Sequence, residues 1–269
     1  TSGTLKTVAG ENIESVTVQN SVKYYYGATV PSLTAKTMTI EGHTVTFSKW
    51  TSNNETYVKS STVNPYGSFT WPAIPDGTAI TLTASASKTP NKYEVTYKDV
   101  VGSTTGKVLG TSKESVNFGI QVTGASKGTD TTEGAYYKGY LYDSSTTATV
   151  TTSGATVYRI FKPSTNTKYT VEHYVMKTDG TYEEEATKTD STKTGTTDSK
   201  VTIANLKDST LLVTNGIYYS YGQVDGKTVT STTIKGDGTR VIKLYYARTS
   251  GTLKTVAGEN IESVTVQNS

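Results

Sequence analysis

Short runs in which apolar and polar residues alternate recur along this chain. In residues 92–100, Tyr93, Val95 and Tyr97 alternate with charged residues and a threonine. Successive side chains of a strand point to opposite faces, so this pattern predicts a strand with one buried and one solvated face. No segment shows the 3.6-residue apolar period of an amphipathic helix, and the chain is therefore predicted to be all-β. The same alternation predicts six core residues: Val95, Val171, Ile242, Leu244, Ile80 and Leu82.

Two segments share one order of predicted strands. KYEV opens at Lys92 and KYTV opens at Lys168, and each segment later holds a glycine followed by an aromatic-rich strand, at Gly139 and at Gly216. We interpret the segments as divergent copies of one module, each of a common domain size. If the copies superpose, three pairs of residues should correspond: Tyr93 with Tyr169, Val95 with Val171, and Val157 with Val241.

Residues 1–89 match these segments poorly and are predicted to form a β module of a different kind. Segments 88–92 and 162–168 each contain a proline, which stiffens a connection, and they mark the module boundaries. Asp-Gly pairs predict hairpin turns in the last module: Asp179-Gly180, Asp225-Gly226 and Asp237-Gly238. We therefore predict a rod of small β modules with antiparallel sheets, β-grasp-like or sandwich, over residues 1–89, 90–164 and 165–248.

The first 21 residues return unchanged as residues 249–269, so Thr249 lies 248 residues after Thr1. A repeat of this kind is typical of proteins that grow by stacking units along a line. Residues 249–269 are predicted to be the start of the next period, and the chain to be a piece of a longer protein. We expect this second copy to pack against the end of the last module, or to pair with a neighbouring chain as an added strand. The residues predicted to make this inter-repeat contact are Leu5, Val8, Leu253 and Val256.

Composition narrows the function classes. Only 33% of the residues are hydrophobic, which favours several thin cores over one large core. The net charge of +3 comes from interspersed charges, so a nucleic-acid partner is not expected. The chain has no cysteine, which excludes disulfides and thiolate metal sites, and no apolar run is long enough for membrane insertion in this segment.

Residues capable of catalysis or metal binding are sparse. His173 lies on the inward face of a predicted strand, which favours a core or sheet-edge position, and His43 has no neighbouring residues that would complete a metal site. The acidic run 183–185 lacks the register of a calcium loop. No nucleophile motif accompanies either histidine, so we expect no enzyme activity, no metal site and no cofactor. The sequon at Asn54 predicts an N-glycosylation site, and clustered tyrosines suggest either sheet-covering residues or sugar-stacking platforms.

The strand patterns resemble a known class of repeats. Segments 92–162 and 168–247 are similar to the MucBP-type and related β-grasp-like repeats of bacterial surface adhesins, through the opening KYxV, the glycine-aromatic strand and the closing strand. Residues 43–50 and 80–84 are loosely similar to the Listeria–Bacteroides type of repeat. The resemblance implies a secreted, surface-attached stalk or adhesin, and it brings no catalytic residues.

The sequence therefore predicts a structural repeat unit of an extracellular stalk or fibre at the cell surface. Its partners would be neighbouring copies of itself, in the same chain or as a homopolymer, and its modules would pack end to end. The alternative is an adhesin module that binds glycans or matrix.

Overall fold

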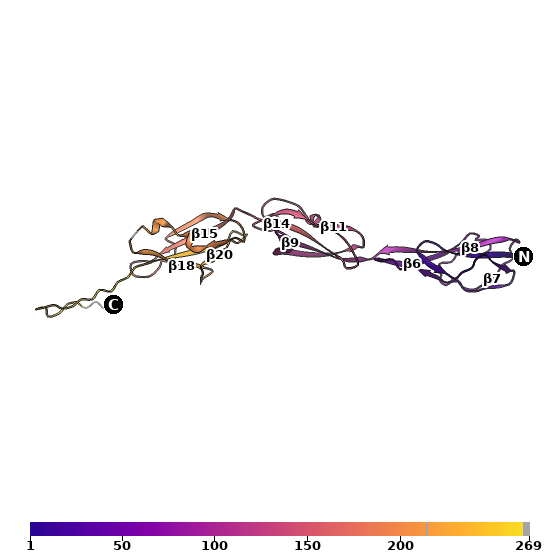
Figure 1. Ribbon diagram of the computed structural model, residues 1–269, viewed down its shortest axis with the longest axis horizontal. Helices are drawn as coiled ribbons and strands as arrows, with labels where there is room; N and C mark the ends of the chain where they lie inside the picture. The colour runs from indigo at the N-terminus through magenta and orange to yellow at the C-terminus, as the bar shows by residue number, and fades with distance from the viewer. Residues whose placement is uncertain (214, 266–269) are drawn as a thin grey trace. The chain divides into compact units, whose positions relative to one another are not determined.

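The structure, a computed structural model, describes residues 1–213 and 215–265 (Figure 1). The last four residues of the second copy, 266–269, lie outside the described residues. The regular elements are strands and three short 3-10 turns: η1 (Gly124–Lys127), η2 (Ile203–Leu206) and η3 (Ser209–Leu211). No α-helix occurs in the part of the chain that the structure describes, and the all-β prediction is confirmed.

The chain divides into two compact units. The first unit comprises residues 1–98, 111–126 and 145–158, and the second comprises residues 99–110, 127–144 and 159–269. The first unit holds a whole four-stranded sheet, called here the first sheet, and the second unit holds a whole five-stranded sheet, the last sheet. Another four-stranded sheet, the middle sheet, has strands that run from one unit into the other, so the module boundaries named above stay a prediction.

The first sheet has the strand order β3-β1-β8-β6. Its strands are β1 (Ser2–Ala9), β3 (Val22–Tyr25), β6 (His43–Ser52) and β8 (Thr78–Pro90). β1 is antiparallel to β3 and parallel to β8, with register pairs from Gly3↔Thr78 to Ala9↔Ala84. Two small sheets accompany it: β2 (Ile13–Val16) with β5 (Ala35–Thr37), and β4 (Thr29–Val30) with β7 (Phe69–Thr70).

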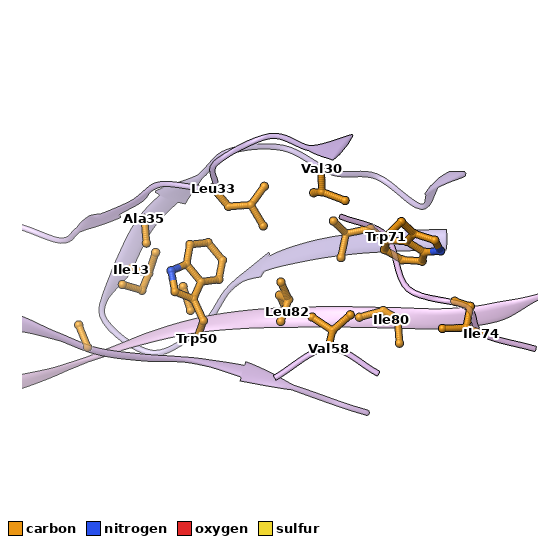
Figure 2. Packing of buried hydrophobic residues seen from close by; sticks show 13 residues of the cluster. Ile13, Val30, Leu33, Ala35, Trp50, Val58, Trp71, Ile74, Ile80 and Leu82 are labelled. Atoms are coloured by element: carbon orange, nitrogen blue, oxygen red, sulfur yellow. The ribbon is translucent and has the colours of Figure 1, made fainter. Parts of the chain in front are cut away.

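The core beside the first sheet is a thin apolar layer. Figure 2 shows Ile80 and Leu82 of β8 facing Val30 and Leu33 from the opposite layer, with Trp50 beside them. All five side chains are almost completely buried. The first sheet and the layer opposite it therefore share one narrow core, as a chain with few apolar residues requires.

The last sheet has the order β16-β15-β21-β18-β19. Its strands are β15 (Thr167–Val175), β16 (Lys188–Gly195), β18 (Ile217–Val224), β19 (Lys227–Thr228) and β21 (Val241–Arg248). β15 is antiparallel to β16 and parallel to β21. A small sheet pairs β17 (Lys200–Thr202) with β20 (Ser231–Thr233). Two residues next to this small sheet belong to the core of the last sheet: Ile203, the first residue of η2, and Ile234, which directly follows β20.

The middle sheet has the order β10-β9-β14-β12. Its strands are β9 (Lys92–Val101), β10 (Val108–Asn117), β12 (Tyr140–Ser145) and β14 (Ala155–Pro163). A small sheet pairs β11 (Gln121–Thr123) with β13 (Thr147–Thr149).

All three main sheets have the same strand order. Counted along the chain within each sheet, the strands lie in the order second, first, last, third, and only β19 is added at the edge of the last sheet. The prediction of a different kind of first module is therefore wrong for its main sheet. What differs is the accompanying layer, which has two small sheets beside the first sheet and one beside each of the others.

The six predicted core residues are confirmed, since each is at most 1% exposed. The expected correspondence of Val157 with Val241 is wrong, because Val157 is fully buried and Val241 is 36% exposed. In β21 the alternating buried positions begin at Ile242, one residue after Val241. A shift of one residue moves a side chain to the other face of a strand. Of the three Asp-Gly pairs, Asp225-Gly226 has positive φ at both residues and joins the antiparallel strands β18 and β19.

Candidate functional site at the sheet junctions

The last strand of each sheet runs almost directly into the first strand of the next. Asn91 alone separates β8 from β9, and residues 164–166 separate β14 from β15. The two segments expected as linkers, 88–92 and 162–168, are therefore largely strand. These places are called here the first junction, around Asn91, and the second junction, around Ser164.

At the first junction Asn91 is bound on both sides by the backbone. Its N–H donates to the carbonyl of Gly42, 2.8 Å away, and its carbonyl accepts from the N–H of Phe118, also 2.8 Å away. The Phe118 ring meets the His43 ring edge-on at 5.6 Å. Gly42 has φ +67°, and a Cβ there would lie 2.1 Å from the Phe118 ring, so glycine alone fits this contact.

The second junction repeats these backbone hydrogen bonds. The N–H of Ser164 donates to the carbonyl of Gly139 at 2.8 Å, and the carbonyl of Ser164 accepts from the N–H of Thr197 at 2.9 Å. Gly139 has φ +82°, and a Cβ there would lie 2.4 Å from the Cα of Gly236. Both junctions thus use a left-handed glycine directly before the third strand of the preceding sheet.

Polar side chains reinforce the second junction. The Nζ of Lys107 lies 3.0 Å from Asp198 Oδ1 and 3.0 Å from the Tyr140 hydroxyl, which itself donates to Asp198 Oδ2 at 2.5 Å. Burial, and then the hydrogen bond to Asp198, raise the pKa of Tyr140, so the phenol stays a proton donor. Because the Lys107 side chain is 57% exposed, the ion pair itself should contribute at most about 1 kcal/mol.

Thr249 makes the first of the two backbone hydrogen bonds seen at each junction. Its N–H donates to the carbonyl of Gly216 at 2.8 Å, and Gly216 has φ +88° and directly precedes β18, the third strand of the last sheet. The second hydrogen bond of the pattern occurs at the other copy of this residue, where the carbonyl of Thr1 accepts from the N–H of Tyr26 at 3.0 Å. Sequence reasoning noted Gly139 and Gly216 as repeat markers but missed this role, because the contacts are made by the backbone.

The four residues predicted to make inter-repeat contacts have very different environments. Leu5 is completely buried in β1 and Val8 is half-buried. Leu253 and Val256 are 66% and 71% exposed and lie outside any strand. In this chain they are therefore not buried by the last sheet, and the alternative of pairing with a neighbouring copy stays a prediction.

The predicted glycosylation site lies in a turn after β6. The Oδ1 atom of Asn54 accepts from the N–H of Thr56 at 3.2 Å, and Asn54 is half-exposed while Thr56 is exposed. Glycosylation at Asn54 stays a prediction.

A buried ion pair lies within the second unit. The Arg159 guanidinium donates to both carboxylate oxygens of Asp99 at 2.8 and 2.7 Å, and its third nitrogen donates to the carbonyl of Lys127 at 2.7 Å. Tyr137 donates to Asp99 at 2.6 Å, and burial together with that hydrogen bond raises the pKa of Tyr137 to about 12. Since each charge has its partner, this cluster is suited to holding structure.

His173 is buried and in contact with another core residue. It is 3% exposed, its Nδ1 lies 2.9 Å from the Tyr246 hydroxyl, and burial lowers its pKa. This agrees with the predicted core position. Among the described residues, no three His, Cys, Asp or Glu side chains are grouped as metal ligands would be. The described helical turns also include none able to cross a membrane.

The largest tyrosine cluster lies on the last sheet. Tyr174 and Tyr221 both stack on Tyr245, with ring centres 5.0 and 4.6 Å apart, and Tyr182 meets Tyr245 edge-on. Stacked cross-strand rings stabilise a sheet. Because these rings pack on one another, the cluster supports the sheet-covering interpretation more than a sugar platform.

Comparisons with known proteins give no family. No protein-family model matches the chain, and no curated protein matches it. The MucBP-type and Listeria–Bacteroides resemblances are therefore not confirmed. Among solved structures, the chain is similar to "Streptococcal High Identity Repeats in Tandem (SHIRT) domains 3-4 from cell surface protein", at 14% identity and a TM-score of 0.31 over 61% of this chain and 98% of that chain.

Proposed function

We propose that this chain is one period of a tandemly repeated structural protein, an extracellular stalk or fibre built by end-to-end packing of β modules. The observation that carries the proposal is the duplicated segment. Its first copy contains β1, an interior strand of the first sheet, while the described part of its second copy, residues 249–265, follows the last sheet and forms no strand. A following period would supply those partners, the equivalents of β3 and β8.

The proposal has an energetic reason. In the first copy Leu5 and Ile13 are at most 2% exposed, whereas their equivalents Leu253 and Ile261 are 66% and 55% exposed. Burying a side chain of this size contributes about 1.5–3 kcal/mol. A further period would therefore convert the exposed second copy into a core strand, and each sheet would be stabilised by its neighbour in the array.

The test is a chain of two periods, residues 1–248 followed by residues 1–269. Hydrogen exchange at Leu253 and Val256 should slow to the rates of Leu5 and Val8, because these amides would then lie in a sheet. The 269-residue chain is the matched control, in which both amides should exchange rapidly. Fast exchange at Leu253 in the two-period chain would contradict the proposal.

The cellular role needs a separate measurement. Electron microscopy of native material should show thin filaments or stalks with a uniform repeat. A glycan array probed with the chain tests the alternative of a sugar-binding adhesin, and specific binding there would favour that alternative.

A further inference from the structure

We propose that consecutive periods meet at a junction in which Tyr26 of one period packs on Gly216 and Ile217 of the preceding period, around Thr249. This inference rests on the proposed function and adds the residues of the contact. The partner is the next copy of this chain, whether it continues the same polypeptide or begins another.

The first argument is the repeated backbone pattern. At both internal junctions one residue donates its N–H to a glycine carbonyl and accepts, at its own carbonyl, an N–H from the next sheet. Thr249 already makes the first hydrogen bond and Thr1, its copy, already makes the second. A single threonine at the period boundary would make both, as Asn91 and Ser164 do.

The second argument is the backbone conformation around Tyr26. Tyr26, Phe118 and Thr197 each donate the second hydrogen bond of the pattern, and each is followed by a residue of positive φ. Those following residues are Gly27 at +85°, Gly119 at +79° and Asp198 at +63°. The three positions are therefore equivalent, and Tyr26 stands where the next sheet meets the preceding one.

The third argument is exposure. Thr197 is 1% exposed and Phe118 is half-buried at their junctions, whereas Tyr26, which has no preceding sheet in this chain, is 67% exposed. Its counterpart surface, formed by Gly216 and Ile217, is partly buried, and Ile217 packs in part against the core of the last sheet. Gly216 has the left-handed conformation of Gly42, and Ile217 opens the third strand as His43 does. Phe118 packs on the glycine and the histidine at the first junction, so an aromatic ring at Tyr26 fits over Gly216 and Ile217.

The experiment uses the two-period chain and places Tyr26→Ala in either the first or the second period. In the second period the substitution should speed hydrogen exchange at the Thr249 amide at least tenfold, because the ring that covers this amide is lost. In the first period the same substitution should change that rate less than twofold, because no sheet precedes it. Tyr26→Phe in the second period should behave like the unsubstituted chain, as phenylalanine occupies this position at the first junction.

The outcomes separate the two proposals. The proposed junction would be overturned if Tyr26→Ala changed exchange at the Thr249 amide equally in the two periods, or had no effect in the second period. The Leu253 amide would still exchange slowly in either case, so the proposed function would stand. Fast exchange at Leu253 in the unsubstituted two-period chain would instead overturn the proposed function. Circular dichroism of each variant checks that the sheets are retained.

Discussion

Residues 1–17 and 249–265 have the same sequence, yet only the first copy lies in a sheet. In the first copy Leu5 is completely buried between β3 and β8, and in the second copy Leu253 is 66% exposed. The strand conformation is therefore set by the neighbours that the chain supplies, since a single strand cannot satisfy its own backbone groups.

The turn that follows β1 differs from the strand in this respect, because it has the same conformation in both copies. Asn12 and Asn260 have φ values of +59° and +63°. The hydroxyl of Thr7 donates to the carbonyl of residue 17 at 2.7 Å, and the hydroxyl of Thr255 donates to that of residue 265 at 2.8 Å. The turn conformation and this side-chain hydrogen bond thus keep the second copy close to the conformation of the first copy. The entropy cost of ordering the segment when it pairs with neighbouring strands is therefore reduced.

The largest expected difference between the copies concerns their leucines. Leu5→Ala should lower the free energy of unfolding of the first sheet by about 2–5 kcal/mol, because it opens a cavity in a closed core. Leu253→Ala should change stability by less than about 0.5 kcal/mol in the 269-residue chain. Urea denaturation of both variants measures this. Equal losses would mean that the second copy is buried after all.

A smaller difference is expected at the copied glycine. A Cβ at Gly3 would lie 2.6 Å from the carbonyl oxygen of Thr78, whereas nothing lies within 4 Å of a Cβ at Gly251. Gly3→Ala should therefore cost about 1–3 kcal/mol through overpacking, and Gly251→Ala should be close to neutral. Thermal unfolding of the two variants gives the comparison. A stable Gly3→Ala variant would show that β1 can move away from β8.

The copied threonines should differ less. Thr7 donates to the carbonyl of Thr17 and accepts from the N–H of Gln19 at 2.8 Å, so Thr7→Val should cost about 1 kcal/mol or slightly more. Thr255→Val removes an exposed hydrogen bond and should change global stability by less than about 0.5 kcal/mol. The second substitution should instead broaden the amide signals of residues 258–262 in NMR spectra. Unchanged signals there would argue that the turn does not need this hydroxyl.

The smallest effect is a pH dependence of the last sheet, to which the second copy is attached. Burial lowers the pKa of His173 below its unfolded value of about 6.5. The unfolded chain therefore takes up a proton that the folded chain does not, and stability should fall as the pH drops below about 6.5. Urea titrations of the chain at pH 7 and pH 5.5 measure this slope. His173→Phe is the control, and a slope that persists in it would assign the effect to other groups.

Sequence reasoning reached the strands and their buried faces more easily than the contacts between sheets. Ile242 and Leu244 were found because alternation depends only on side-chain polarity. The identical order of the three main sheets was missed, because the first sheet reaches it with different residues and a longer connection between its third and last strands. The junctions were missed because their hydrogen bonds run between backbone groups, and only the glycines at 42, 139 and 216 leave a trace in the sequence.

The parallel pairing of first and last strands has a mechanical consequence. If the chain is pulled at its two ends, tension enters the first sheet at the start of β1 and leaves at the end of β8. These two strands are neighbours over seven register pairs. Pulling on the chain therefore slides β1 and β8 past each other in shear, so their hydrogen bonds resist together instead of opening one after another. β15 and β21 are also parallel neighbours, and Asn91 alone separates β8 from β9 along the chain. Each sheet would thus act as a stiff link that unfolds only at high force.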